Sequence, residues 1–233
     1  MDFAISDLIH MLFPLGILFF SVIIHEISHG YVALLQGDHT AEQAGRLTLN
    51  PIRHFDFMGM VVLPLFSYWS FGIPVGYAKP VPVNPYQLRN QRWGDLFVSA
   101  AGPLSNFLTA IIFAIVTRSL LAANDLLIFS PFVQLLGYIV QVNIGLTLLN
   151  LVPIPPIDGS KIVHALLPFR VRNRLTNTGY SLRSYVSQYW IIALVLFLYF
   201  GGPIIRVIVT VLAPIQNALY SLLMGPYWEV FLR

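Results

Sequence analysis

The chain has 233 residues, of which 57% are hydrophobic and only 10% are charged. Soluble domains average about 45–50% apolar and about 25% charged residues, so this composition excludes a water-soluble globule, a disordered chain and a nucleic-acid-binding protein. The formal net charge is only +3, and we interpret the basic residues as topology markers. Because cysteine is absent, disulfides are excluded and any metal must be held by His, Asp or Glu. The composition predicts an integral membrane protein of one domain.

Four apolar stretches are candidates for helices that cross the hydrocarbon core, which takes about 20 residues. They cover residues 8–35, 96–121, 132–152 and 186–200. The fourth is followed by Gly201-Gly202-Pro203 and a further apolar segment, and these three residues fit a kink and a turn equally well. We therefore predict an all-α polytopic bundle of about five to six transmembrane helices.

An apolar segment over residues 57–77 is interrupted by glycine and proline, which favours two short strands or a re-entrant hairpin over a helix. Residues 46–49 alternate between polar and apolar side chains, as in a half-buried strand. The fold prediction thus includes a short membrane-associated β-hairpin or re-entrant segment. An exposed strand edge in either place could hold an extended substrate by β-addition; a structural hairpin packed on the core is the alternative.

The charges in the loops predict the orientation of the chain. Residues 160–183 contain five basic residues and no acidic one, and the segment before the second span is also basic, with Lys79, Arg89 and Arg92 against Asp95. The positive-inside rule places both segments on the cytoplasmic side. By the same rule we expect the acidic N-terminus to lie outside.

The first span contains His25-Glu26-Ile27-Ser28-His29. Positions i and i+4 share one face of a helix, so the two imidazoles can bind one Zn²⁺. Glu26 can reach a metal-bound water, which gives the HExxH arrangement of two ligands and a general base. Ionisable residues inside a membrane span are energetically costly, so they are usually part of a functional site. The alternative is that these residues only form hydrogen bonds inside the bundle or lie at the membrane interface.

A third ligand is expected, because catalytic zinc usually has three protein ligands. The best candidate is Asp158, which follows a proline-rich segment that ends the third span and precedes Gly159, where a sharp turn is allowed. Counted from Leu8 at the outer end of the first span, with a rise of 1.5 Å per residue, His25 lies about 25 Å into the membrane. It is therefore near the cytoplasmic end of its span. Topology therefore brings Asp158 to a similar depth. A turn carboxylate at a helix end is the alternative.

Polar residues also form stripes on the second and third spans. The residues concerned are Ser99, Gly102, Asn106 and Thr109 on the second span, and Asn143, Thr147 and Asn150 on the third. Such faces suit close helix packing and a wet interior. We assign no catalytic role to Asn106 or Asn143.

The two motifs together resemble the site-2 protease family, the zinc intramembrane metalloproteases of peptidase family M50. The resemblance rests on the HExxH sequence and on Asn150 with Pro153, Pro156, Asp158 and Gly159. The segments 45–51, 76–85 and 101–106 resemble the small prokaryotic branch that has no PDZ or CBS domain. The expected organisation is one domain over residues 1–233, with a core at about 8–165 and C-terminal helices at about 186–224.

The resemblance implies one Zn²⁺ per chain, with His25, His29 and Asp158 as its ligands. It also implies that Glu26 is the catalytic base and that Asn150 contacts the substrate or the oxyanion. The implied activity is zinc-dependent endopeptidase cleavage within or near transmembrane segments of membrane proteins. The implied location is the plasma membrane of a prokaryote, with the active site near the cytoplasmic side.

Two other functions remain open from the sequence. One is a different membrane zincin with a glutamate as third ligand, for which Glu229 is the C-terminal candidate. The other is a zinc-binding or transport protein that uses the same ligands without proteolysis, although no internal repeat typical of transporters is present. The expected partners are a transmembrane protein substrate and the lipid bilayer, and no nucleic acid; the oligomeric state and natural substrate are open.

Overall fold

The computed structural model describes residues 5–71, 76–155, 157–167 and 190–232. These residues form helices joined by short irregular segments, and they contain no strand. The four long helices are α1 (Ile5–Leu35), α5 (Gln91–Ala123), α6 (Pro131–Leu151) and α9 (Trp190–Met224). The short elements are α2 (Thr40–Gln43), α3 (Pro51–His54), the π-helical turn η1 (Met58–Val62), α4 (Leu63–Phe71), α7 (Asp158–Leu166), and the 3-10 turns η2 (Pro85–Gln87), η3 (Asp125–Phe129) and η4 (Gly225–Leu232).

The described residues include four helical segments that are long and apolar enough to cross a bilayer. They are Phe13–Leu35, Trp93–Ala123, Pro131–Leu151 and Gly201–Glu229. The protein is thus a helical membrane protein, and three of these segments correspond to the first three predicted spans. The predicted count of five to six is not reached within the described part of the chain. The predicted fourth span begins at residue 186, and residues 168–189 lie outside that part.

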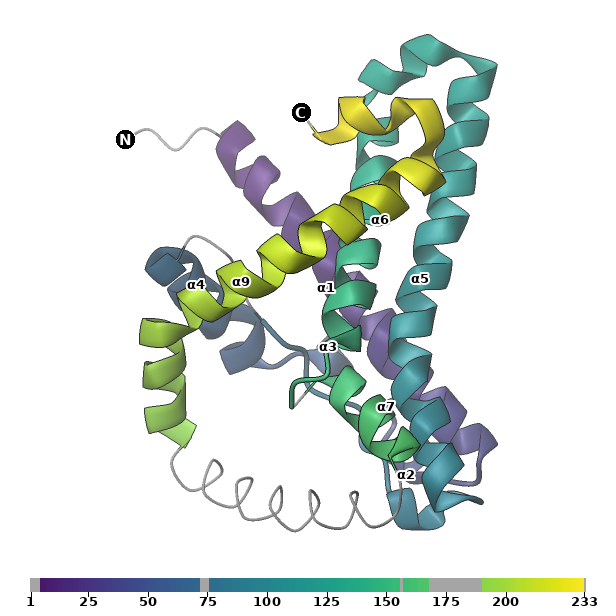
Figure 1. Ribbon diagram of the computed structural model, residues 1–233, viewed down its shortest axis with the longest axis vertical. Helices are drawn as coiled ribbons and strands as arrows, with labels where there is room; N and C mark the ends of the chain where they lie inside the picture. The colour runs from purple at the N-terminus through teal and green to yellow at the C-terminus, as the bar shows by residue number, and fades with distance from the viewer. Residues whose placement is uncertain (1–4, 72–75, 156, 168–189, 233) are drawn as a thin grey trace.

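The core of the bundle lies where α5, α6 and α9 meet. Helix α5 packs along α6 and against α1, and Figure 1 shows α5 and α6 running side by side. The buried residues of the core are Ala110 and Ala114 of α5, Val140 and Ile144 of α6, and Tyr220 and Met224 of α9. The alanines allow the helix backbones to approach closely, which is how membrane helices associate. Large apolar side chains such as Ile112 and Leu222 point outward and are exposed, as expected for a surface in contact with lipid.

The Gly201-Gly202-Pro203 segment is a kink and not a turn. It lies inside α9, which continues through it without interruption. Figure 1 shows α9 bent sharply between its first, light-green part and the longer part that leads to the C-terminus. Proline removes a helical hydrogen bond and glycine weakens the helix, so a bend without a break is the expected result.

The predicted strands at residues 57–77 are wrong for Met58–Phe71, which is helical. Pro64 has no N–H to donate, and the carbonyl of Gly59 instead accepts a hydrogen bond from the N–H of Tyr77 at 3.0 Å. A Cβ on Gly59 would lie 2.3 Å from the carbonyl oxygen of Tyr77, so this glycine permits a close backbone contact. Residues 46–49 are irregular and are not a strand either. A re-entrant path stays a prediction, and residues 72–75 lie outside the described part.

A segment without regular secondary structure over residues 78–84, here called the strap, contacts α1. The side chain of Val81 is buried, and a Cβ on Gly30 of α1 would lie 2.8 Å from its Cγ1, so helix and strap are in direct contact. The buried carboxylate of Asp38, just beyond α1, accepts a hydrogen bond from the N–H of Asn84 at 2.6 Å. Burial opposes ionisation of Asp38, but hydrogen bonds from Thr40 and Asn84 outweigh it and lower its pKa below the ordinary value of 3.8. The strap is therefore tied to the end of α1.

Candidate metal centre and active site

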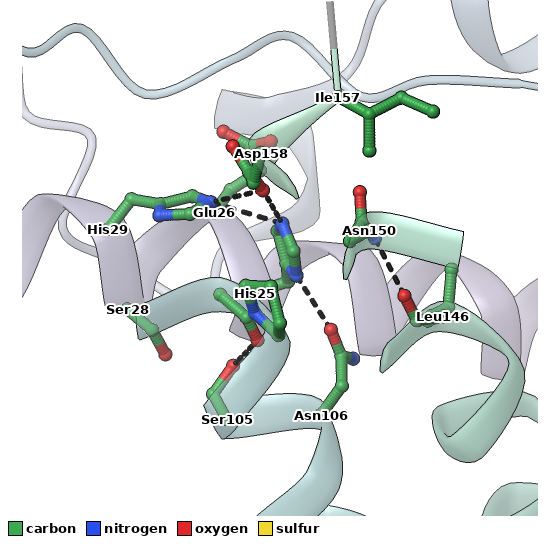
Figure 2. Close-up of polar contacts among 12 residues, drawn as sticks. His25, Glu26, Ser28, His29, Ser105, Asn106, Leu146, Asn150, Ile157 and Asp158 are labelled. Atoms are coloured by element: carbon green, nitrogen blue, oxygen red, sulfur yellow. Dashed lines mark hydrogen bonds and ion pairs between the residues drawn. The ribbon is translucent and has the colours of Figure 1, made fainter. Parts of the chain in front are cut away.

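Two histidines of α1 and the first residue of α7 converge inside the bundle. The Nε2 atoms of His25 and His29 lie 3.0 Å apart. The Oδ2 atom of Asp158 is 3.0 Å from the first and 3.1 Å from the second. All three side chains are buried, and the dashed lines in Figure 2 show them meeting at this carboxylate oxygen. The structure thus brings together three of the predicted site residues.

The position of Asp158 follows from the way α6 ends. The helix stops at Leu151, and Pro153 and Pro155 follow in irregular backbone before α7 starts at Asp158. A Cβ on Gly159 would lie 2.4 Å from the carbonyl oxygen of Leu151, so the start of α7 packs directly on the end of α6. Only glycine fits this contact, and it aims Asp158 back at α1.

Helix α5 fixes the orientation of both imidazoles. The Nδ1 atom of His25 donates a hydrogen bond to Oδ1 of Asn106 at 2.6 Å, and Nδ1 of His29 donates to the carbonyl of Val98 at 2.6 Å. A carbonyl can only accept, so the proton of His29 is assigned to Nδ1, and the amide hydrogen bonds of Asn106 support the same assignment for His25. Each Nε2 is then left with a lone pair directed toward Asp158.

A glycine of α5 faces the two rings. A Cβ on Gly102 would lie 2.5 Å from Nε2 of His25 and 2.5 Å from Nε2 of His29. Val98, Gly102 and Asn106 are spaced by four residues and therefore share one face of α5. This face supplies one acceptor for each histidine and, between them, the room for both rings.

The donor set fits Zn²⁺. Two imidazole nitrogens and one carboxylate oxygen lie within 4.8 Å of one another. Lone pairs this close repel each other unless a cation lies between them, and His₂-carboxylate is a ligand set of catalytic zinc sites. Hydrogen bonds from the outer imidazole nitrogens to an amide and a carbonyl are typical of metal-binding histidines. The nearby Nζ of Lys161 lies 3.0 Å from Oδ1, the other carboxylate oxygen of Asp158.

Glu26 is held beside this centre by the strap. Its Oε2 accepts a hydrogen bond from the N–H of Val81 at 2.9 Å. The strap is fixed in turn by Arg46, whose Nη2 donates to the carbonyls of Lys79 at 2.6 Å and Pro80 at 3.3 Å. Glu26 is not one of the three converging ligands. The arrangement is that of a metal centre with an adjacent, separately oriented carboxylate.

Comparison with known proteins agrees with this geometry. The model of peptidase family M50 matches residues 13–124 and 119–198 of the chain. The chain belongs to peptidase family M50. The matched ranges include both histidines, Glu26 and Asp158, and the candidate metal ligands described above are in keeping with a zinc metalloprotease family.

Curated relatives carry the same assignment in their names. A Bacillus subtilis protein named "Putative zinc metalloprotease YwhC" is 38% identical over 159 residues, which is 67% of this chain and 69% of the relative. "Putative zinc metalloprotease Rip2" of Mycolicibacterium smegmatis is 30% identical over 141 residues, and Rip2 of Mycobacterium tuberculosis H37Rv is 31% identical over 143 residues. Both alignments cover 60% of this chain and 51% of the relative. No solved structure is significantly similar to the chain.

Asn150, expected from the family resemblance to contact the substrate, makes a different contact here. Its Nδ2 donates to the carbonyl of Leu146 in its own helix at 2.9 Å, as the dashed line in Figure 2 shows. No hydrogen bond joins it to the three converging ligands among the described residues. Its role toward substrate stays a prediction.

Asn106 was noted in the sequence only as part of a polar stripe, and its contact with His25 was not predicted. Besides accepting from His25, it donates through Nδ2 to Oδ1 of Asn143 at 2.9 Å, and Asn143 donates to Oγ of Ser21 at 3.0 Å. The four side chains form a buried chain of hydrogen bonds that links α1, α5 and α6. The polar stripe on the second span was the available signal, but the stripe does not show that Asn106 contacts His25.

Replacing Asn106 by alanine is expected to lower zinc affinity by about 10–100-fold, the usual effect of losing an outer hydrogen-bond partner of a metal-binding histidine. The free Nδ1–H of His25 would then be buried without an acceptor. Competition with a chromophoric zinc chelator measures the dissociation constant. Ser105→Ala is the control, because its hydroxyl donates only within α5, to the carbonyl of Gly102. Equal affinity of the Asn106 variant and the wild type would contradict this role.

Proposed function

We propose that this protein is a zinc-dependent intramembrane endopeptidase that hydrolyses peptide bonds within or near transmembrane segments. The observation that carries the proposal is the convergence of His25, His29 and Asp158 beside Glu26, with three of these four residues inside the apolar span Phe13–Leu35. Membership of a peptidase family supports hydrolysis. The position of the centre within a membrane-crossing helix supports substrates that are themselves in the membrane.

Each group has a defined task in the proposed reaction. His25, His29 and Asp158 would hold the zinc ion, which acts when bound as a Lewis acid and brings the pKa of coordinated water toward about 7. Glu26 accepts a proton from the attacking water and returns it to the leaving amine. The N–H of Val81 orients the carboxylate of Glu26 through its hydrogen bond. The side-chain amide of Asn150 is proposed to donate to the carbonyl that is attacked.

An apolar cavity supports a hydrophobic substrate. It has a volume of about 480 Å³ and lies between α1, α5 and α6, lined among others by Phe20, Ile24 and Phe113. Ile24 directly precedes His25, so the cavity reaches the turn of α1 that carries the metal ligand. We propose that apolar side chains next to the scissile bond occupy it. By the loop charges, the centre lies near the cytoplasmic side of a prokaryotic plasma membrane and the N-terminus lies outside.

The test is cleavage of a model transmembrane peptide by the purified full chain in liposomes, followed by mass spectrometry of the products. Chelation is expected to abolish cleavage, and adding back one equivalent of zinc is expected to restore it, because the chain has no other ligand cluster of this kind among its described residues. Cleavage that persists after complete removal of metal would contradict the proposal. Zinc transport without peptide cleavage would support the transport alternative.

A further inference from the structure

A second cavity lies against the strap, and all the charged side chains that line it are basic. Its volume is about 780 Å³, and it is lined by residues of the 44–55 segment and by Lys79, Pro80 and Pro82. Val81, between these two prolines, faces α1 instead. The lining includes three cationic side chains, Arg46, Arg53 and Lys79, and no carboxylate. Such a cavity is suited to an anion.

Arg46 is a buried cation without an ion-pair partner in the described part of the chain. Its side chain is only 7% exposed. Its Nη2 reaches two strap carbonyls, while its Nε is buried without any hydrogen-bond partner. Burial lowers the pKa of Arg46, the charge of Glu26 raises it and Arg53 lowers it again. Glu26 is thus an opposing charge nearby, but it forms no ion pair with Arg46, and an anion in the cavity would give this buried guanidinium a direct partner.

The surroundings of the cavity resemble a surface that meets lipid headgroups. Leu49, Ile52 and Phe55 lie in the same segment as Arg46 and Arg53, and these apolar residues are 62%, 80% and 49% exposed. At 1.5 Å per residue, Gly30, which contacts Leu47 and the strap, is about 8 Å from the end of α1. The contact between α1 and the strap, beside the cavity, is therefore about 8 Å from the level where the apolar span ends. Exposed apolar side chains beside Arg and Lys are typical of a protein surface at the membrane interface.

We propose that this cavity binds the phosphate headgroup of an anionic phospholipid. Arg53 and Lys79 contact the headgroup at the mouth, Arg46 lies at the back, and Ile52 and Phe55 contact the start of the acyl chains. An acidic peptide segment fits the charge but does not account for the exposed apolar side chains at the rim.

The carbonyls of Lys79 and Pro80 accept hydrogen bonds from Arg46, and the N–H of Val81, the next one in the chain, donates to Glu26. A bound headgroup therefore stabilises the strap that orients the proposed catalytic base; this consequence, unlike the binding itself, rests on the proposed function.

Binding is tested first, without any measurement of activity. Native mass spectrometry of the full chain in detergent gives the affinity for phosphatidylglycerol and for phosphatidylcholine. Arg53→Gln and Lys79→Gln are each expected to lower the preference for phosphatidylglycerol by about fivefold, the factor expected for one basic side chain at an anionic surface. Arg89→Gln is the matched control, since Arg89 is an exposed cation of the same predicted face that does not line the cavity. Equal losses in all three variants, or no loss in the first two, would overturn the proposal.

Three further experiments distinguish a lipid headgroup from a free anion or an acidic substrate, and distinguish lipid binding from proteolytic activity. Inorganic phosphate at millimolar concentration is expected not to displace phosphatidylglycerol; full displacement would show a free-anion site instead. Peptide cleavage is expected to be faster in phosphatidylglycerol vesicles than in phosphatidylcholine vesicles, and this difference should shrink in Lys79→Gln. If the wild type cleaves in neither, the proposed function fails while the binding result stands. Selective loss of cleavage of peptides with acidic flanks, with lipid affinity unchanged, would identify a substrate subsite and refute lipid binding.

Discussion

Replacement of Glu26 by glutamine is expected to lower kcat/KM for a transmembrane peptide by about 10²–10⁴-fold, the range that a general base contributes. Glutamine has the size of glutamate and keeps an oxygen that can accept the N–H of Val81, but its amide cannot take a proton from water. Because Glu26 is not one of the three converging ligands, zinc content should stay at one ion per chain. The measurements are product formation by mass spectrometry and metal content by elemental analysis of the same sample.

The control for this experiment is Glu42→Gln, which changes the same functional group at a position that is not part of the centre. Glu42 is exposed and lies 2.7 Å from Nδ1 of His39. It should retain wild-type cleavage. Wild-type-like cleavage by the Glu26 variant would show that another group accepts the proton. Loss of zinc together with activity would show that Glu26 binds the metal itself.

Replacement of Gly102 by alanine is expected to lower zinc affinity at least tenfold, although no ligand is changed. The added Cβ would lie 2.5 Å from the Nε2 atoms of His25 and His29. Neither ring can simply rotate away, since each is held at Nδ1 by α5 itself. Overpacking of this kind usually costs about 1–3 kcal/mol, and here the strain falls on the atoms that would bind the metal. Zinc titration against a competing chelator measures the effect.

Gly16→Ala is the matched control, because a Cβ on Gly16, also in a membrane-crossing helix, would have no heavy atom within 4 Å. It should bind zinc as the wild type does, with a thermal unfolding midpoint in detergent that is not lowered. If Gly102→Ala binds zinc with wild-type affinity, the close approach of α5 to the two rings is not needed for the centre.

The sequence predicted the convergence of three side chains better than it predicted what supports them. The spacing of His25 and His29 put both on one helix face, and the prolines that end α6 made Asp158 the candidate for the third position. The contact between His25 and Asn106 joins residues 81 positions apart, and depends on how α5 is rotated about its axis. That rotation is set by packing against α1 and α6 together. A polar stripe indicates that one face of a helix packs inside the bundle, but it does not identify the side chain on the neighbouring helix that this face contacts.

The erroneous strands at residues 57–77 have a related cause. Glycine and proline in an apolar run normally indicate strand ends and turns. Here the helix tolerates Pro64 because the carbonyl of Gly59 has a partner in Tyr77, 18 residues further on. The local sequence shows that Pro64 cannot donate a backbone hydrogen bond, but it does not show that Tyr77 donates one in its place. The tertiary structure therefore overrides the local preference.

The distribution of the centre along the chain has a consequence for biosynthesis. His25 and Asp158 are 133 residues apart. At about 5–20 residues per second, the ribosome adds Asp158 roughly 7–27 s after His25. During that interval α1 is already made, yet its histidines lack first the acceptors of α5 and then the carboxylate of α7. The three side chains therefore come together only after α7 has been made and has docked, so a zinc ion held by all three, as proposed above, would be acquired late in biosynthesis.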